Sequence, residues 1–139
     1  KAGEFGHMIL VPGGRKCYCG KKGCADAYCA SSALTSGEYE SLELFMEELS
    51  GGDSKAERKW EEYLDNLAVL ISNLRMAYDM DIILGGEVGG YLADFMLPLG
   101  EKVMEYNGFD RDTRYLKNCT YRKEASAVGA AKYFFDRIV

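Results

Sequence analysis

Apolar side chains recur at helical spacing along several stretches of the chain, and the longest stretch is the most regular. From residue 60 to residue 78 a large apolar residue returns every three or four positions, whereas residues 55–65 place charges on the other face. This pattern is typical of a surface helix with one buried stripe. Because Asp53 or Ser54 offers a side-chain oxygen for an N-cap, we predict that the helix starts there. The stripe contains Trp60, Tyr63, Leu64, Leu67, Ile71, Leu74 and Tyr78.

Shorter segments with similar spacing predict further helices. Residues 25–34 are rich in alanine and serine and favour a short helix, and residues 39–49 carry a periodic apolar face that ends before Gly51 and Gly52. Two more helices are expected over residues 90–106 and 125–138, where apolar side chains return to helical spacing.

Two short apolar runs favour strands, one over residues 81–84 and a second over residues 115–119. Gly85 and Gly86 follow the first run and precede a predicted helix. In α/β folds, such a turn presents backbone N–H groups at the carboxyl end of a sheet, where phosphates bind. A plain tight turn is the alternative. Helices that alternate with sparse strands indicate an α/β fold.

Composition and charge limit the function classes. With 139 residues, of which 47% are apolar, the chain suits one domain with a real core. The net charge of −5 repels phosphate backbones, so we expect no nucleic acid on this stretch. Neither a membrane span nor a signal peptide is predicted, which favours a cytoplasmic location. Because the chain opens without methionine, we expect a fragment of a longer polypeptide.

One segment gathers the single histidine of the chain and three of its five cysteines. The C-x-C spacing is too tight for a disulfide framework, so reduced thiols are expected. Thiolates and imidazole are the donors that zinc prefers in a tetrahedral site, and glycines in between allow the chain to wrap an ion. The predicted ligands are His7, Cys17, Cys19 and Cys24, within a zinc knuckle over residues 7–24. Ordinary loop cysteines are the alternative, and Cys29 and Cys119 are expected to be core thiols.

Two carboxylates flank this knuckle. A closed four-ligand site is structural, so we expect the metal to order a neighbouring polar site. Glu4 precedes His7, Asp26 follows Cys24, and a strand and a helix start held by the same ion would bring both acids beside the imidazole. Such acceptors suit a polyhydroxylated ligand. For Asp26 the alternative is a charge that stabilises a helix N-terminus, and for Glu4 it is simple solvent exposure.

These residues together resemble the signature of the ROK family, which contains bacterial sugar kinases and sugar-responsive transcriptional repressors. The match comprises E-x-G-H from Glu4 to His7, C-x-C-G-x-x-G-C from Cys17 to Cys24, and the D-A-Y that follows. The resemblance extends to ILGGEVGG and to ASAVGAAKYF. It implies an actin-like, ribonuclease-H-like α/β fold of two lobes, of which residues 1–139 would be the C-terminal, sugar-binding lobe.

The resemblance also assigns roles to residues. It implies zinc at His7, Cys17, Cys19 and Cys24, sugar hydroxyls at Glu4, His7 and Asp26, and the phosphates of a nucleotide near Gly85 and Gly86. Aspartate stands at position 26 where glutamate is usual in the family, and Glu87 follows the glycine turn where a small residue is common. The first change shortens the reach to a hydroxyl, and the second places a negative charge near phosphate.

The resemblance further implies that the catalytic aspartate lies upstream, so no catalytic residue is predicted in this chain and the chain alone should not transfer a phosphoryl group. About three strands would leave the sheet incomplete and its edge exposed. We therefore expect association, as a homodimer or a higher homo-oligomer.

Two functions follow from these observations. Because of Asp26 and Glu87, the favoured hypothesis is the sugar-sensing lobe of a transcriptional regulator, which would contact DNA only through a domain absent from this chain. The alternative is the C-terminal lobe of an ATP-dependent sugar kinase that resembles a glucokinase and uses ATP with Mg²⁺. A zinc-dependent binding module unrelated to sugars is the least favoured hypothesis.

Overall fold

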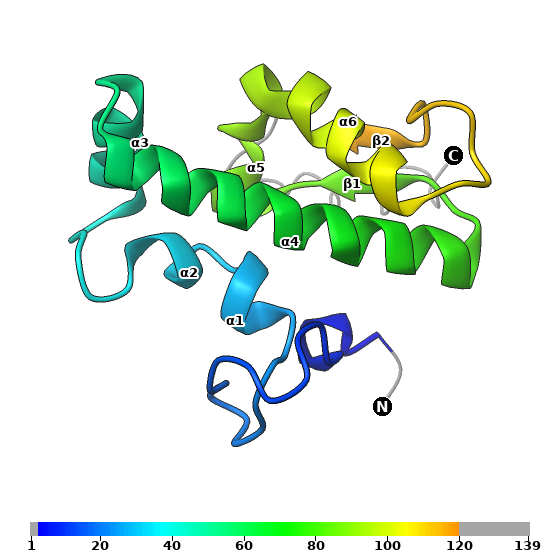
Figure 1. Ribbon diagram of the computed structural model, residues 1–139, viewed down its shortest axis with the longest axis horizontal. Helices are drawn as coiled ribbons and strands as arrows, with labels where there is room; N and C mark the ends of the chain where they lie inside the picture. The colour runs from blue at the N-terminus through cyan, green and yellow to red at the C-terminus, as the bar shows by residue number, and fades with distance from the viewer. Residues whose placement is uncertain (1–2, 120–139) are drawn as a thin grey trace, which may run out of the picture.

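The computed structural model describes residues 3–119, and one long helix organises them. Helix α4 (Ser54–Tyr78) crosses the molecule, with α5, α6 and two strands on one side and α1, α2 and the N-terminal segment on the other (Figure 1). The side chain of Asp53 accepts a hydrogen bond of 2.9 Å from the backbone N–H of Ala56, which confirms the predicted N-cap. The helix ends at Asp79, whose φ of 49° is left-handed.

The buried face of α4 follows the predicted stripe over most of its length. Trp60 is 2% exposed and stacks on Tyr63, with ring centroids 5.3 Å apart. The last turn differs from the prediction, since Tyr78 is 53% exposed where the helix extends past the core. The residues of α4 that are buried are Ala56, Trp60, Tyr63, Leu64, Leu67, Ala68, Ile71 and Ser72.

The helix predicted over residues 25–34 is two short helices, α1 (Asp26–Cys29) and α2 (Ser32–Thr35), separated by an extended Ala30. Tyr28 and Leu34 explain the break, because both are buried although they stand six positions apart. In one continuous helix their side chains would point about 120° apart around the axis. Breaking the helix lets both of them face the core.

Helix α3 (Leu42–Ser50) lies close to its prediction. It begins at Leu42 rather than at residue 39 because the Ser41 hydroxyl accepts a hydrogen bond of 3.2 Å from the backbone N–H of Leu44 and caps the helix. Tyr39 instead packs its ring edge-on against Phe45, at a centroid distance of 5.1 Å. The start of α3 is thus set by its cap, and Tyr39 contributes to the core from outside the helix.

The described residues form two strands, β1 (Ile82–Leu84) and β2 (Leu116–Asn118), which pair in parallel with Ile83 opposite Lys117. The connection between them contains α5 (Gly86–Gly89), the 3₁₀ helix η2 (Leu92–Phe95) and α6 (Met96–Tyr106). The α/β class is confirmed. The helix predicted over residues 90–106 is split into η2 and α6. Pro98 lies in the first turn of α6, where proline is tolerated. Helix α5 was not predicted.

The sheet has two strands in the part of the chain that the structure describes, where about three were expected. Residues 5–7 form a 3₁₀ turn, η1 (Phe5–His7), so the strand expected next to the metal is wrong. A strand needs a neighbour to pair with, whereas this turn closes on itself by a 3.1 Å hydrogen bond from the backbone N–H of His7 to the carbonyl of Glu4. The helix predicted over residues 125–138 lies outside the described residues.

The core lies between α4 and the elements on either side of it. Lys102 of α6 fastens that helix to α4 through ion pairs of 2.9 Å to Glu61 and 2.7 Å to Asp65. Between residues 3 and 119, none of the helices has the length and apolar character that crossing a bilayer requires. The largest fully buried side chains are Phe45, Leu34, Leu64, Ile71, Leu99, Val103, Asn107 and Cys24.

Candidate metal centre and adjoining polar site

A tight hairpin gathers the cysteines of the knuckle. Its arms are held by a 2.8 Å hydrogen bond from the backbone N–H of Cys17 to the carbonyl of Lys21, and Gly20 turns the chain with a φ of 93°. An antiparallel bridge between Ile9 and Cys24 then joins the hairpin to the segment that follows His7. The backbone therefore brings His7 back to the cysteines.

The four predicted donors converge. The Nδ1 atom of His7 lies 3.7 Å from the Sγ atom of Cys17, and the Sγ atoms of Cys19 and Cys24 lie 3.6 Å apart. All four donor atoms lie within 4.8 Å of one another. A tetrahedral zinc ion with Zn–S bonds near 2.3 Å separates its sulfur ligands by about 3.8 Å. The donor set thus fits a tetrahedral metal in both chemistry and spacing.

The thiols of this cluster differ in acidity. The backbone N–H of Lys21, the largest influence, lowers the pKa of the Cys19 thiol. Burial, followed by hydrogen bonds with the neighbouring thiols, raises the pKa of Cys24 to about 11. Without a cation, the cluster therefore disfavours three thiolates together, whereas a divalent ion would compensate their charge.

Arg15, two residues before Cys17, connects the knuckle to two helices. Its guanidinium lies 4.6 Å from the centroid of the Tyr28 ring and 2.7 Å from the Glu62 carboxylate of α4. Its backbone N–H donates to the Tyr28 hydroxyl at 2.9 Å. Arg15 thus fixes the knuckle to α1 and α4.

Tyr18, between two of the cysteines predicted to bind the metal, contacts the predicted polar residues. Its hydroxyl lies 3.2 Å from Nε2 of His7 and donates a 2.8 Å hydrogen bond to Oδ2 of Asp26. The hydrogen bond to Asp26 raises the pKa of the Tyr18 phenol to about 12. Tyr18 is not among the predicted site residues, because its only signal in the sequence is its position between Cys17 and Cys19, and that position does not show where a side chain points.

The acids behave differently. The Tyr18 hydroxyl connects Asp26 to His7, since it contacts both side chains. The Asp26 carboxylate also packs so closely on Gly6 that a side chain at position 6 would collide with it. The carbonyl of Glu4 accepts the hydrogen bond from His7 described above, whereas its side chain is exposed. The structure therefore brings Asp26 to the imidazole and places Glu4 in the adjacent turn.

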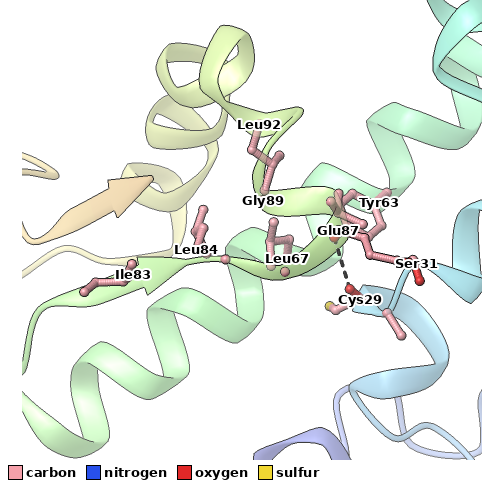
Figure 2. A pocket seen from close by; sticks show the side chains of 13 residues that line it. Cys29, Ser31, Tyr63, Leu67, Ile83, Leu84, Glu87, Gly89 and Leu92 are labelled. Atoms are coloured by element: carbon pink, nitrogen blue, oxygen red, sulfur yellow. Dashed lines mark hydrogen bonds between the residues drawn. The ribbon is translucent and has the colours of Figure 1, made fainter. Parts of the chain in front are cut away.

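A separate hollow lies at the glycine turn after β1. A cavity of about 320 Å³ is lined by Gly85, Gly86 and Glu87 together with Cys29 of α1 and Tyr63 of α4 (Figure 2). The Tyr63 hydroxyl donates to the carbonyl of Cys29 at 3.0 Å. Burial raises the pKa of the Cys29 thiol to about 12, and its side chain packs against the core as expected. Gly86 has a φ of 74°, which only glycine adopts without strain.

Known proteins resemble the chain along nearly its whole length. It is 32% identical to N-acetylmannosamine kinase of Haemophilus influenzae, over 97% of this chain and 46% of that protein. It is also 32% identical to N-acetylmannosamine kinase of Vibrio vulnificus, over 66% of this chain and 34% of that protein. The chain therefore spans about half the length, or less, of the relatives it matches.

A solved structure shares the fold. The ROK hexokinase from Thermus thermophilus superimposes with a TM-score of 0.75 and 26% identity, over 99% of this chain and 49% of that one. This likeness supports the predicted actin-like fold.

The comparisons contradict the transcriptional regulator that the sequence analysis favoured, since these relatives are named as kinases. The error lay in the weight given to two acidic residues. Asp26, although one methylene shorter than glutamate, still lies within hydrogen-bond reach of the site, and Glu87 is exposed to solvent, which weakens the effect of its charge on a nearby phosphate. Residues 1–137 match the ROK family profile, and the chain therefore belongs to the ROK family.

Proposed function

We propose that this chain is the C-terminal, sugar-binding lobe of an ATP-dependent sugar kinase. The observation that carries the proposal is the convergence of His7 and Asp26 beside a four-donor metal site, in a chain whose relatives are named as N-acetylmannosamine kinases. N-Acetylmannosamine is therefore the first sugar to test.

In this proposal, zinc is a structural ion. His7, Cys17, Cys19 and Cys24 would hold it and fill its coordination shell, so the ion would compensate the thiolate charge and would not polarise a substrate. His7 uses Nδ1 toward the sulfur cluster, which leaves Nε2 directed at the polar site. The metal ligand and the sugar contact are then two atoms of one imidazole ring.

The sugar would be held by hydroxyl hydrogen bonds. A carboxylate accepts from two hydroxyls, so Asp26 and Glu4 can between them bind several neighbouring oxygens, while the imidazole edge of His7 orients one of these. Gly6 sets the position of Asp26, because its missing side chain leaves room for the carboxylate. Orientation of the acceptor hydroxyl is what phosphoryl transfer requires of this lobe.

ATP with Mg²⁺ would bind on the side of Gly85 and Gly86. The support is the backbone there, which turns at a left-handed glycine beside a cavity of about 320 Å³. Helix α5 has 4 residues and is too short to act as an anion site by itself, so phosphate contacts would also come from outside this turn. No residue of this chain is proposed as the general base.

An assay of the intact protein tests the proposal. We expect ADP release that depends on N-acetylmannosamine or glucose and that falls roughly ten- to a hundredfold in Asp26→Ala, because a charge-assisted contact to the acceptor is lost. Glu101→Ala, a change of an exposed acid on α6, is the control and should keep full turnover. Absence of turnover with every hexose and N-acetylhexosamine would contradict the kinase.

A further inference from the structure

The Tyr18 side chain lies across the polar site although most of its surface is exposed to solvent. Its ring is 82% exposed and touches His7 edge-on, with centroids 5.1 Å apart. Its hydroxyl nevertheless makes two polar contacts, at 3.2 Å to Nε2 of His7 and at 2.8 Å to Oδ2 of Asp26. Both contacts are made to residues proposed to bind the sugar.

The chemistry of these contacts is that of a bound sugar hydroxyl. When Nδ1 of His7 binds the metal, Nε2 carries the proton and donates to an oxygen, while Asp26 accepts from an O–H group. One hydroxyl between the two residues satisfies both, and the phenol supplies it at ordinary hydrogen-bond distances. A sugar hydroxyl that bound the same two atoms would need the same position.

We propose that Tyr18 is a gate that determines access and selectivity at the sugar site: its phenol hydroxyl occupies the position of a ligand hydroxyl between His7 and Asp26, and the bound sugar displaces it. This inference rests on the proposed function. Tyr18 is a specificity-determining residue because a ligand must offer a hydroxyl that replaces both contacts, and a ligand without one leaves the gate closed.

Opening the gate requires a rotation of one side chain and no rearrangement of the knuckle. The backbone on either side of Tyr18 is fixed, since Cys17 and Gly20 take part in the hydrogen bonds of the hairpin. The ring has solvent around it, so it can turn outward with little loss of packing. The cost of opening is therefore the two hydrogen bonds, which the incoming hydroxyl restores.

Tyr18→Phe in the intact protein tests the gate, because it removes the hydroxyl and keeps the ring. If the closed form dominates, the variant should bind N-acetylmannosamine roughly tenfold more tightly by calorimetry, since the competent form is no longer a minority. Tyr106→Phe is the matched control, a half-exposed tyrosine at the end of α6, and its affinity should equal that of the wild type. Zinc content near one per chain in every variant shows that the knuckle is intact.

A second measurement follows the ring itself. With 3-fluorotyrosine in place of tyrosine, the intact protein should give a fluorine signal that is absent in Tyr18→Phe and that changes its chemical shift when N-acetylmannosamine is added, because the phenol loses its contacts with His7 and Asp26. A signal that stays unchanged at saturating sugar overturns the gate.

The outcomes separate the gate from the proposed function. If Asp26→Ala abolishes binding while Tyr18→Phe binds equally or more weakly than the wild type, the sugar site stands and the gate is wrong. If the wild type, Tyr18→Phe and Tyr18→Ala all fail to bind any hexose or N-acetylhexosamine, the sugar site itself fails and the gate falls with it. Tighter binding by Tyr18→Phe, with the fluorine shift in the wild type, supports both.

Discussion

The backbone of Gly6 lies against the carboxylate of Asp26, so closely that a Cβ atom at position 6 would overlap the carboxylate oxygens. These residues are twenty positions apart, one in the 3₁₀ turn that ends in His7 and one in the first turn of α1. Their contact joins the two segments that carry the imidazole and the acid. The E-x-G-H motif therefore needs glycine at position 6, because any side chain there would collide with the Asp26 carboxylate.

Gly6→Ala should weaken sugar binding without removing the metal. The added methyl group pushes the Asp26 carboxylate away from Tyr18 and His7, and a displaced charged contact costs about 1.5–3 kcal/mol, or roughly ten- to a hundredfold in affinity. Calorimetry with N-acetylmannosamine measures the loss, and zinc analysis should still find one ion per chain. Gly108→Ala is the control, because a side chain there meets open space. Equal affinities in the two variants would show that the Gly6 contact is unimportant.

Removal of one thiolate should remove the metal. The four donors lie within 4.8 Å of one another, so Cys19→Ser replaces a thiolate by a poor zinc ligand and leaves an incomplete site. We expect zinc content to fall from one per chain to near zero and the Tm to lose its dependence on added zinc. Cys29→Ala, which removes a thiol outside the cluster, is the control, and its zinc content should stay near one per chain. A zinc-free wild type with an unchanged Tm would contradict the structural ion.

The sequence predicted that these four side chains come together, because ligand chemistry is local information. His7 and the three cysteines are residue types that zinc selects, and their short spacing limits the arrangements that they can adopt. Tyr18 was missed because the direction of its side chain depends on the hairpin, which is closed by contacts between Cys17 and Lys21. A tyrosine has no spacing rule that would mark it as a member of the site.

The helices also differ in whether their ends are set by neighbouring residues or by contacts with distant ones. Helix α4 has a long periodic stripe and its own N-cap, so its start at Ser54 follows from neighbouring residues. The break at Ala30 does not, since it arises from burying both Tyr28 and Leu34 against other elements. The lack of a strand at residues 5–7 likewise depends on tertiary pairing, to which local β propensity is a weak guide.

The loop after α6 should lose stability in acid. Arg75, followed by Asn107, holds the pKa of the Asp110 carboxyl below its usual range, through hydrogen bonds of 3.1 Å and 2.7 Å. A carboxyl with a depressed folded-state pKa stabilises the protein above its ordinary pKa of about 4, and this stabilisation is lost as the pH falls toward the folded-state value. Asp110→Asn should therefore have a lower Tm than the wild type at pH 7, and this difference should shrink below about pH 4.

Thermal unfolding between pH 2 and pH 8 measures this difference, with Asp94→Asn as the control for an exposed acid of η2. That variant should follow the wild type across the whole range. A Tm difference for Asp110→Asn that is constant with pH would show that the charge of the carboxylate is irrelevant and that only its hydrogen-bonding shape matters.

The two glycines of the turn after β1 should respond differently to the same substitution. Gly86 has a φ of 74°, so Gly86→Ala strains the backbone although the space around it is open, and we expect a loss of about 1 kcal/mol in unfolding free energy. Gly85 has a φ of −130°, and a Cβ there would lie 3.7 Å from that of Cys119, an ordinary contact. Gly85→Ala should be tolerated and is the matched control.

If the turn contacts nucleotide as proposed, relaxation of the strain at position 86 moves the N–H groups of the turn, and the KM for ATP should rise in Gly86→Ala alone. Denaturant unfolding and ATP titration of the sugar-dependent turnover measure both effects, and equal KM values in the two variants would place the nucleotide elsewhere.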